Sequence, residues 1–65
     1  MVKEEWEQAS AGGRRWAYFG SMIHGATLDS PTVRIVRWYS SGVRVRFSDG
    51  HQETVHPDYL FLRAA

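Results

Sequence analysis

The fold is decided by the stretch Val43-Arg44-Val45-Arg46-Phe47-Ser48-Asp49-Gly50-His51-Gln52-Glu53-Thr54-Val55. Its first half alternates apolar residues with arginines, a period of two that is typical of a strand with one buried and one solvent-facing side. Asp49-Gly50 follows at once, and an Asp-Gly step between two such runs is the strongest short-range signal of a β-hairpin. Glycine takes positive φ without steric cost, so the chain can reverse there. The stretch therefore predicts two antiparallel strands joined by a tight turn.

A further strand is expected upstream, over residues 32–39. This segment reads Thr-Val-Arg-Ile-Val-Arg-Trp-Tyr, and its β-branched and aromatic residues favour extended structure. Ser40-Ser41-Gly42 supplies a short turn into Val43, which completes a three-stranded meander. Pro31 cannot donate a hydrogen bond to a strand ladder, so we expect the strand to begin directly after it.

The rest of the chain predicts two more strands around this meander. Arg14 to Phe19 reads as an extended segment, which Ser21 to His24 can continue before a long loop. Pro57 ends the fourth strand, Pro-Asp-Tyr suits a single tight turn, and a last short strand is expected over Phe61 to Arg63. Val55-x-Pro57-x-Tyr59-Leu60 resembles the Pro-x-Tyr step before the last strand of SH3 domains. We therefore expect an all-β fold, a small five-stranded SH3-like barrel.

A short helix is expected at the N-terminus, over residues 2–9. Acidic residues occupy its first turn, where the helix dipole favours them, and Val2 and Trp6 share one face. Ser10-Ala11-Gly12-Gly13 then breaks the chain. The expected organisation is a helix and flexible linker over 1–13 and the barrel over 14–65. The sequence leaves open whether the helix docks through Trp6 or stays mobile.

The expected core comes from the apolar side of each strand. Segment 32–39 is ambiguous because both of its faces are apolar, which suggests that one face meets a partner or the N-terminal segment. The expected core residues are Val33 or Val36, Ile35 or Trp38, Val43, Val45, Phe47, Val55, Tyr59, Leu60 and Leu62.

Size and composition narrow the class of protein. The chain has 65 residues and no Cys, so neither disulfides nor thiolate metal sites stabilise it. No apolar run approaches the roughly 20 residues of a membrane helix, and the N-terminus is acidic where a signal peptide is basic. We expect a soluble cytoplasmic protein without a membrane partner.

Charge is unevenly distributed along the chain. Residues 1–10 carry a net charge of −2 and residues 11–65 carry +3, and seven of the eight cations are Arg. Arg offers a planar fork of donors that suits phosphate and carboxylate, so its abundance is consistent with contact to a polyanion. Genome composition is an equally good explanation of the same bias.

The candidate binding site is a stripe of arginines. If Val43, Val45 and Phe47 face the core, Arg44 and Arg46 point outward together, and Arg34 joins them if its register agrees. Small barrels bind nucleic acid with such a face, using cations for phosphates and exposed aromatic rings for base stacking. In the alternative, the arginines are solvated strand residues that pair with Glu53, and Trp38 belongs to the core. The residues assigned to nucleic-acid binding are Arg34, Arg44, Arg46, Trp38 and Tyr39, with Trp16 as a further candidate ring.

No catalytic or metal-binding motif is evident. His24, His51 and His56 are too scattered for a ligand motif, and no carboxylate spacing completes a site. We therefore assign no catalytic residues, no metal and no cofactor.

A family-level resemblance covers residues 33–63. Ile35-Val36-Arg37-Trp38-Tyr39-Ser40-Ser41, Gly42 and Val55-His56-Pro57 resemble the core of the plasmid-borne type II dihydrofolate reductases. The resemblance implies an SH3-like barrel that assembles as a homotetramer around a pore for NADPH and dihydrofolate. That family's pore strand reads Val-Gln-Ile-Tyr-Pro, and Thr54 and His56 here replace its Gln and Tyr. The resemblance thus supports the fold and argues against reductase activity.

A second likeness involves the Asp-Gly hairpin. Val45 to Gln52, followed by Pro57, resembles a segment of a small actinobacterial family of unknown function, and Tudor-like domains share a similar Phe-x-Asp-Gly turn. The leading expectation is a non-catalytic module that binds nucleic acid, DNA or RNA. The alternatives are a protein-interaction or self-assembling barrel and, third, a reductase-like homotetramer.

Overall fold

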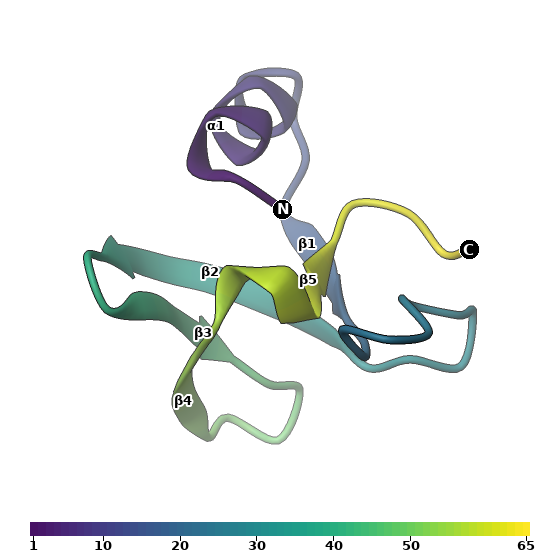
Figure 1. Cartoon of the computed structure of the whole chain (residues 1–65). Coiled ribbons are helices and arrows are strands. Elements are labelled where there is room, and N and C mark those ends of the chain that lie inside the picture. The colour runs from purple at the N-terminus through teal and green to yellow at the C-terminus, as the bar shows by residue number, and fades with distance from the viewer.

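The computed structural model describes all 65 residues and is mostly β-structure (Figure 1). The elements in chain order are α1 (Lys3–Ala11), β1 (Trp16–Phe19), β2 (Thr32–Tyr39), β3 (Gly42–Arg46), β4 (Gln52–Val55), the 3-10 turn η1 (Pro57–Tyr59) and β5 (Leu60–Phe61). The prediction of five strands and a short N-terminal helix is confirmed. Neither helical segment has the length and hydropathy that a membrane span needs.

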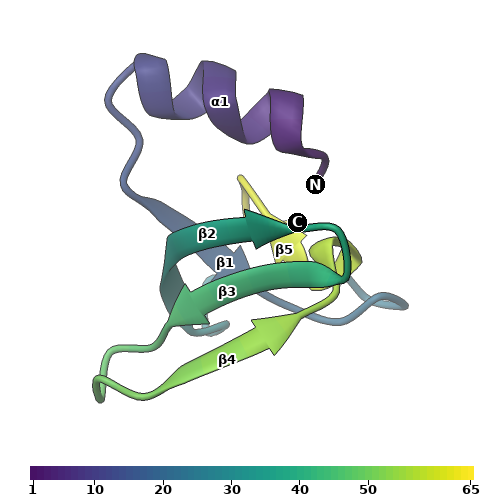
Figure 2. The same cartoon turned by 90° about the vertical axis from the view of Figure 1, so that its left-hand side faces the viewer.

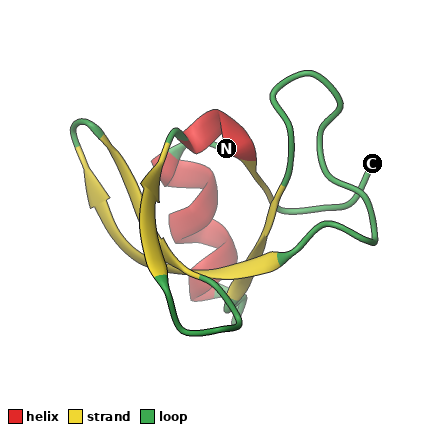
Figure 3. Cartoon of the chain, turned by 90° about the horizontal axis from the view of Figure 1, so that it is seen from below, coloured by secondary structure: helices red, strands yellow, loops and turns green.

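The five strands form one antiparallel sheet in the order β4-β3-β2-β1-β5. The sheet is open, with β4 and β5 as its two edges. Only His56 and the one-turn η1 separate these edge strands in the chain, so the sheet has to curve strongly between them. The curvature is visible from below (Figure 3), and it separates an inner, concave side from an outer side.

The Asp49-Gly50 hairpin forms as predicted and joins β3 to β4. Gly50 has φ +93°, the left-handed region in which a side chain is disfavoured. The Phe47 N–H donates to the His51 carbonyl at 2.9 Å, and the Gly50 N–H donates to the Phe47 carbonyl at 3.0 Å. The Asp49 carboxylate accepts the His51 N–H at 3.0 Å, which is the local bond that favours Asp in turns.

A β-bulge in β2 settles the ambiguity of this strand. The register with β3 shifts between Ile35 and Arg37, so Val36 is an extra residue without an opposite partner. Ile35 and Trp38, which are three residues apart, consequently both pack against the core. In a regular strand they would face opposite sides. The expectation that only one of them faces the core is therefore wrong, and Val36 is exposed.

The core lies on the inner side of the sheet. Its members are Trp6, Ala17, Val33, Val43, Val45 and Leu60, with Met1, Phe19, Ile35, Trp38, Phe47, Val55 and Leu62 packed around them. The predicted core residues of β3 and Leu60 are thus buried as expected. Tyr59 is half-buried beside this cluster, where its ring stacks on Phe19 at a centroid distance of 5.8 Å.

Helix α1 docks on the sheet instead of extending from it (Figure 2). Trp6 is buried and belongs to the same hydrophobic cluster as the strand residues, which answers the question that the sequence left open. The Glu5 carboxylate accepts the Val2 N–H at 3.1 Å and caps the first turn. The Met1 amino group donates to the carbonyls of Pro57 and Leu60 at 3.0 and 3.1 Å.

Two strand boundaries differ from the prediction. β1 ends at Phe19, and Ser21 to Gly25 form a separate tight turn closed by two backbone hydrogen bonds, because Gly25 adopts φ +73°. The last strand is Leu60–Phe61 and not Phe61 to Arg63. Leu60 is already extended directly after η1, and Phe19 and Tyr18 offer partners only to Leu60 and Phe61.

Candidate functional site

Four arginines lie together on the outer side of the sheet, on β2 and β3. Arg34 is directly opposite Arg46, and Arg37 is directly opposite Arg44. Their neighbours in sequence, Val33, Val43 and Val45, are fully buried on the inner side, and alternation turns the arginines the other way. We call the surface formed by Arg34, Arg37, Arg44 and Arg46 together with Trp16 and Tyr39 the arginine face.

No carboxylate neutralises the arginine face. The ion pairs of the molecule all involve histidine, and no Arg or Lys nitrogen lies within 4.0 Å of a carboxylate oxygen. The Arg44 Nε donates to the Gln52 side-chain oxygen at 2.8 Å, which is a neutral partner. Glu53 is the only acidic residue within the five strands, but it is paired with Val45 and points to the inner side. Four positive charges are therefore uncompensated.

This arrangement has an energetic cost. Residues directly opposite each other in an antiparallel pair have Cβ atoms about 4.5–5.5 Å apart, and like charges at such positions are destabilising. The arginine face contains two of these pairs side by side. Screening by salt reduces the repulsion, and a bound anion removes it. The face is thus suited to contact with several negative charges at once.

Two exposed aromatic rings accompany the arginines. The Arg34 guanidinium lies 4.9 Å from the centre of the Trp16 ring, and the Arg37 guanidinium lies 5.6 Å from the centre of the Tyr39 ring. Both distances are within the range of a cation–π interaction. Trp16 and Tyr39 keep 44% and 45% of their surface exposed. Each ring therefore remains accessible beside a cation.

The structure brings four of the five predicted site residues together. Arg34, Arg44, Arg46 and Tyr39 share the arginine face. Trp38 does not belong to it, because the bulge at Val36 turns this ring inward against the core. Its indole Nε1 is buried and has no hydrogen-bond partner.

The sequence does not assign Arg37 to the site, and it names Trp16 only as a further candidate ring. Arg37 reaches it only because of the bulge, since regular alternation from Arg34 places residue 37 on the inner side. Arg37 and Tyr39 are two positions apart in sequence, and this spacing is the one local signal that both side chains lie on the same side of β2. Trp16 enters through its register with Arg34 across β1 and β2, which no local pattern specifies.

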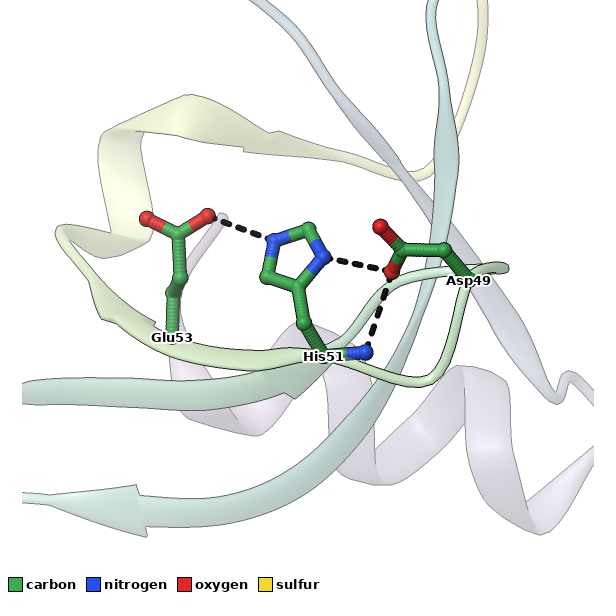
Figure 4. A network of polar contacts seen from close by, with 3 residues as sticks. All are labelled: Asp49, His51 and Glu53. Atoms are coloured by element: carbon green, nitrogen blue, oxygen red, sulfur yellow. Dashed lines mark hydrogen bonds and ion pairs between the residues drawn. The ribbon is translucent and has the colours of Figure 1, made fainter.

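A second polar cluster lies at the β3–β4 turn (Figure 4). The His51 ring is held between two carboxylates, with Nδ1 at 2.5 Å from an Asp49 oxygen and Nε2 at 2.8 Å from a Glu53 oxygen. The ring also stacks on Phe47, with centroids 4.5 Å apart and planes 7° from parallel.

The pKa values in this cluster follow from its hydrogen bonds. Those to Glu53 and Asp49 raise the pKa of His51, and those from the His51 backbone and ring lower the pKa of Asp49. Protonation lets the imidazole donate through both nitrogens to the two carboxylates. We call Asp49, His51 and Glu53 the turn cluster and assign it a structural role.

The two remaining histidines do not add to either cluster. His24 is exposed in the loop between β1 and β2. The His56 Nδ1 accepts the Asp58 N–H at 3.0 Å and so caps η1. No pocket opens on the surface of the molecule.

Comparison of the chain with protein-family models, with curated proteins and with solved structures finds no match.

Proposed function

We propose that this protein is a small non-catalytic module that binds nucleic acid through the arginine face. The observation that carries the proposal is the pair of directly opposed arginines, Arg34 with Arg46 and Arg37 with Arg44, which no carboxylate compensates. A fold that keeps such repulsion in its free state gains most from a ligand with regularly spaced negative charges. The phosphate backbone of a nucleic acid is such a ligand.

The chemistry of the face supports phosphate contact. A guanidinium group presents a planar fork of donors that matches phosphate oxygens, and charge-assisted bonds of this kind are about twice as strong as neutral ones. Three of the four arginines are exposed, and Arg44 is half-buried beside Gln52. Binding would release counterions, so affinity should fall steeply as salt is added.

The scaffold that we propose for this face is an SH3-like barrel. The support is the strand order, the three-stranded meander and the single 3-10 turn that links the two edge strands. The resemblance to type II dihydrofolate reductases fits the same scaffold. Thr54, which replaces the Gln of that family's pore strand, is opposite Arg44 on the outer side of the sheet and adjoins the arginine face.

The test is a fluorescence-anisotropy titration of a labelled oligonucleotide with the full chain at about 50 and 200 mM salt. If all four arginines contact phosphates, the log–log slope should be about −2.8 for a single strand and about −3.6 for a duplex. The decisive variant combines Arg37→Glu with Arg46→Glu. One arginine of each opposed pair is then reversed, so each new carboxylate faces an arginine and the fold is not strained.

We expect this variant to bind about 100-fold more weakly, since two charged hydrogen bonds are lost. The matched control combines Lys3→Glu with Arg63→Glu, which changes the net charge equally at exposed positions outside the face. The control should bind nearly as the wild type does. Equal binding by both double variants would disprove the assignment.

A second proposal, of protein contact, rests on the loop between β1 and β2. Ile23 and Leu28 are 85% and 84% exposed, and Met22 is also exposed. Such side chains favour association with another protein or with a second copy of the chain. The solution mass at high concentration tests self-association. A monomeric mass, unchanged by Ile23→Ser with Leu28→Ser, would exclude it.

A further inference from the structure

We infer that the ligand of the arginine face is a single strand, with unpaired bases stacked on Trp16 and Tyr39. The inference rests on the proposed function and adds the class of nucleic acid. Its starting point is that each exposed ring is paired with an arginine of the face. A cation beside a ring provides, at one place, a partner for a phosphate and a partner for a base.

The two ring–arginine pairs lie at opposite ends of the face. Trp16 is opposite Arg34 in the register of β1 with β2, and Tyr39 is the last residue of β2. Tyr39 is five positions after Arg34, which corresponds to roughly 16 Å at about 3.3 Å per residue. Arg34 and Arg37 lie on β2 between the rings, and Arg44 and Arg46 lie beside them on β3. A strand of several nucleotides can therefore reach both rings while its backbone follows the arginines.

The width of the face disfavours duplex DNA. The residues of the face come from β1, β2 and β3, and Gln52 extends the same side onto β4. Four strands about 4.8 Å apart span roughly 14 Å before side chains are counted. The major groove is about 12 Å wide and admits a helix or a two-stranded ribbon. Helix α1 packs on the core through Trp6, so it does not supply a recognition helix.

Base pairing also hides the surfaces that the rings need. In a duplex the faces of the bases are stacked on one another, whereas in a single strand they are available to aromatic side chains. A duplex would use only the arginines. A single strand would use both the arginines and the rings, and it should bind more tightly at equal salt.

The experiment titrates the full chain with four ligands: a single-stranded DNA of about 12 nucleotides, an RNA of the same sequence, the matching DNA duplex, and inorganic polyphosphate. Either single strand should bind at least about tenfold more tightly than the duplex and polyphosphate. Quenching of Trp emission should accompany single-strand binding, because a base stacks on Trp16. Polyphosphate, which has no bases, should leave the emission almost unchanged.

The variants Trp16→Leu and Tyr39→Leu should each weaken single-strand binding roughly tenfold and leave polyphosphate binding and the salt slope unchanged. Trp16→Phe and Tyr39→Phe, which retain a ring, should restore most of the loss. Circular dichroism of each variant checks that the fold is kept.

The outcomes separate the two proposals. The single-strand inference alone would be overturned by salt-dependent binding that is equal for all four ligands or tighter for the duplex. In that outcome the ring variants would also bind as the wild type does. Absence of binding to every nucleic acid at low salt would overturn the proposed function as well. Loss of single-strand binding in the ring variants, with polyphosphate binding intact, would support both.

Discussion

The arginine face and the turn cluster meet on the β3–β4 hairpin, where Arg44 and Arg46 of the face precede the turn cluster in sequence, and they have opposite electrostatic character. On the face, Arg34 is opposite Arg46 and Arg37 is opposite Arg44, and no carboxylate forms an ion pair with any of them. In the turn cluster, one histidine is held by two carboxylates. Both are exposed to solvent, so burial does not distinguish them. The two regions differ in the side of the sheet to which their residues point.

Glu53 and Thr54 show how this separation arises. They are adjacent in sequence, but Glu53 pairs with Val45 and Thr54 pairs with Arg44, so they point to opposite sides of β4. Glu53 therefore reaches His51 and is unable to neutralise the arginines. In a sheet, the side to which a position points determines which charges interact, and nearness in sequence does not.

Among the changes that test this separation of the two regions, the largest effect is expected from exchanging Glu53 and Thr54. Glu53→Thr combined with Thr54→Glu keeps the composition and net charge but moves the carboxylate opposite Arg44. We expect nucleic-acid affinity to fall between about tenfold and a hundredfold, because the new carboxylate forms an ion pair with the Arg44 guanidinium and repels phosphate. The salt slope should decrease by about 0.7–0.9, the contribution of one contact.

The control for the exchange is Glu53→Thr alone. This variant removes an acid from the opposite side of the sheet, so binding should not weaken. If the exchanged variant bound as tightly as the wild type, the two sides of β4 would not be electrostatically distinct.

The next effect concerns the stability of the free protein. Arg46→Gln relieves the repulsion with Arg34 and should raise the free energy of unfolding by about 0.2–1 kcal/mol. The same change should weaken nucleic-acid binding, roughly tenfold. Urea denaturation and the anisotropy titration measure the two quantities.

Lys3→Gln serves as the control, since it removes one positive charge from the exposed side of α1. Neither stability nor affinity should change appreciably in this variant. A loss of stability in Arg46→Gln would show that the opposed pair is not under repulsion.

In the turn cluster, the expected change is a shift in the pKa of His51. Its hydrogen bond to Glu53 is the main cause that raises this pKa, and the bond to Asp49 comes second. Glu53→Gln should therefore lower the pKa of His51 more than Asp49→Asn does, and both should move it toward 6.5. An NMR titration of the imidazole resonances measures the values. The reverse order would show that the shorter contact, from Asp49 at 2.5 Å, has the larger effect on this pKa (Figure 4).

The smallest effect is the dependence of stability on pH. Because the pKa of His51 is raised, its contribution is fully present below the unfolded value of 6.5 and is lost as pH rises through the folded pKa. The pKa of Asp49 is lowered, so its contribution is present above 3.8 and is lost as pH falls through the folded pKa. The stability difference between wild type and His51→Gln should be widest between pH 3.8 and 6.5.

Nucleic-acid affinity should not follow this pH dependence, because the arginines stay charged and the turn cluster is on the other side of the sheet. Parallel changes of stability and affinity with pH would show that the arginine face and the turn cluster are coupled, contrary to this prediction.

Local patterns in the sequence were sufficient for the hairpin. The alternation of valine and arginine in β3 and the Asp49-Gly50 step act between near neighbours, so they specify the strand, its buried side and its turn. Val43 and Val45 are fully buried for this reason. The outward direction of Arg44 and Arg46 follows from the same alternation.

The tertiary structure decided the composition of the arginine face. The bulge at Val36 exists only in the pairing of β2 with β3, and it turns Arg37 outward and Trp38 inward. Trp16 joins the face through pairing across β1, and Trp6 becomes a core residue by docking a helix that is too short to be stable alone. The order of the residues specifies which segments alternate, because alternation is a property of adjacent residues. Register, bulge and docking depend on contacts between distant segments, so only the folded chain decided them.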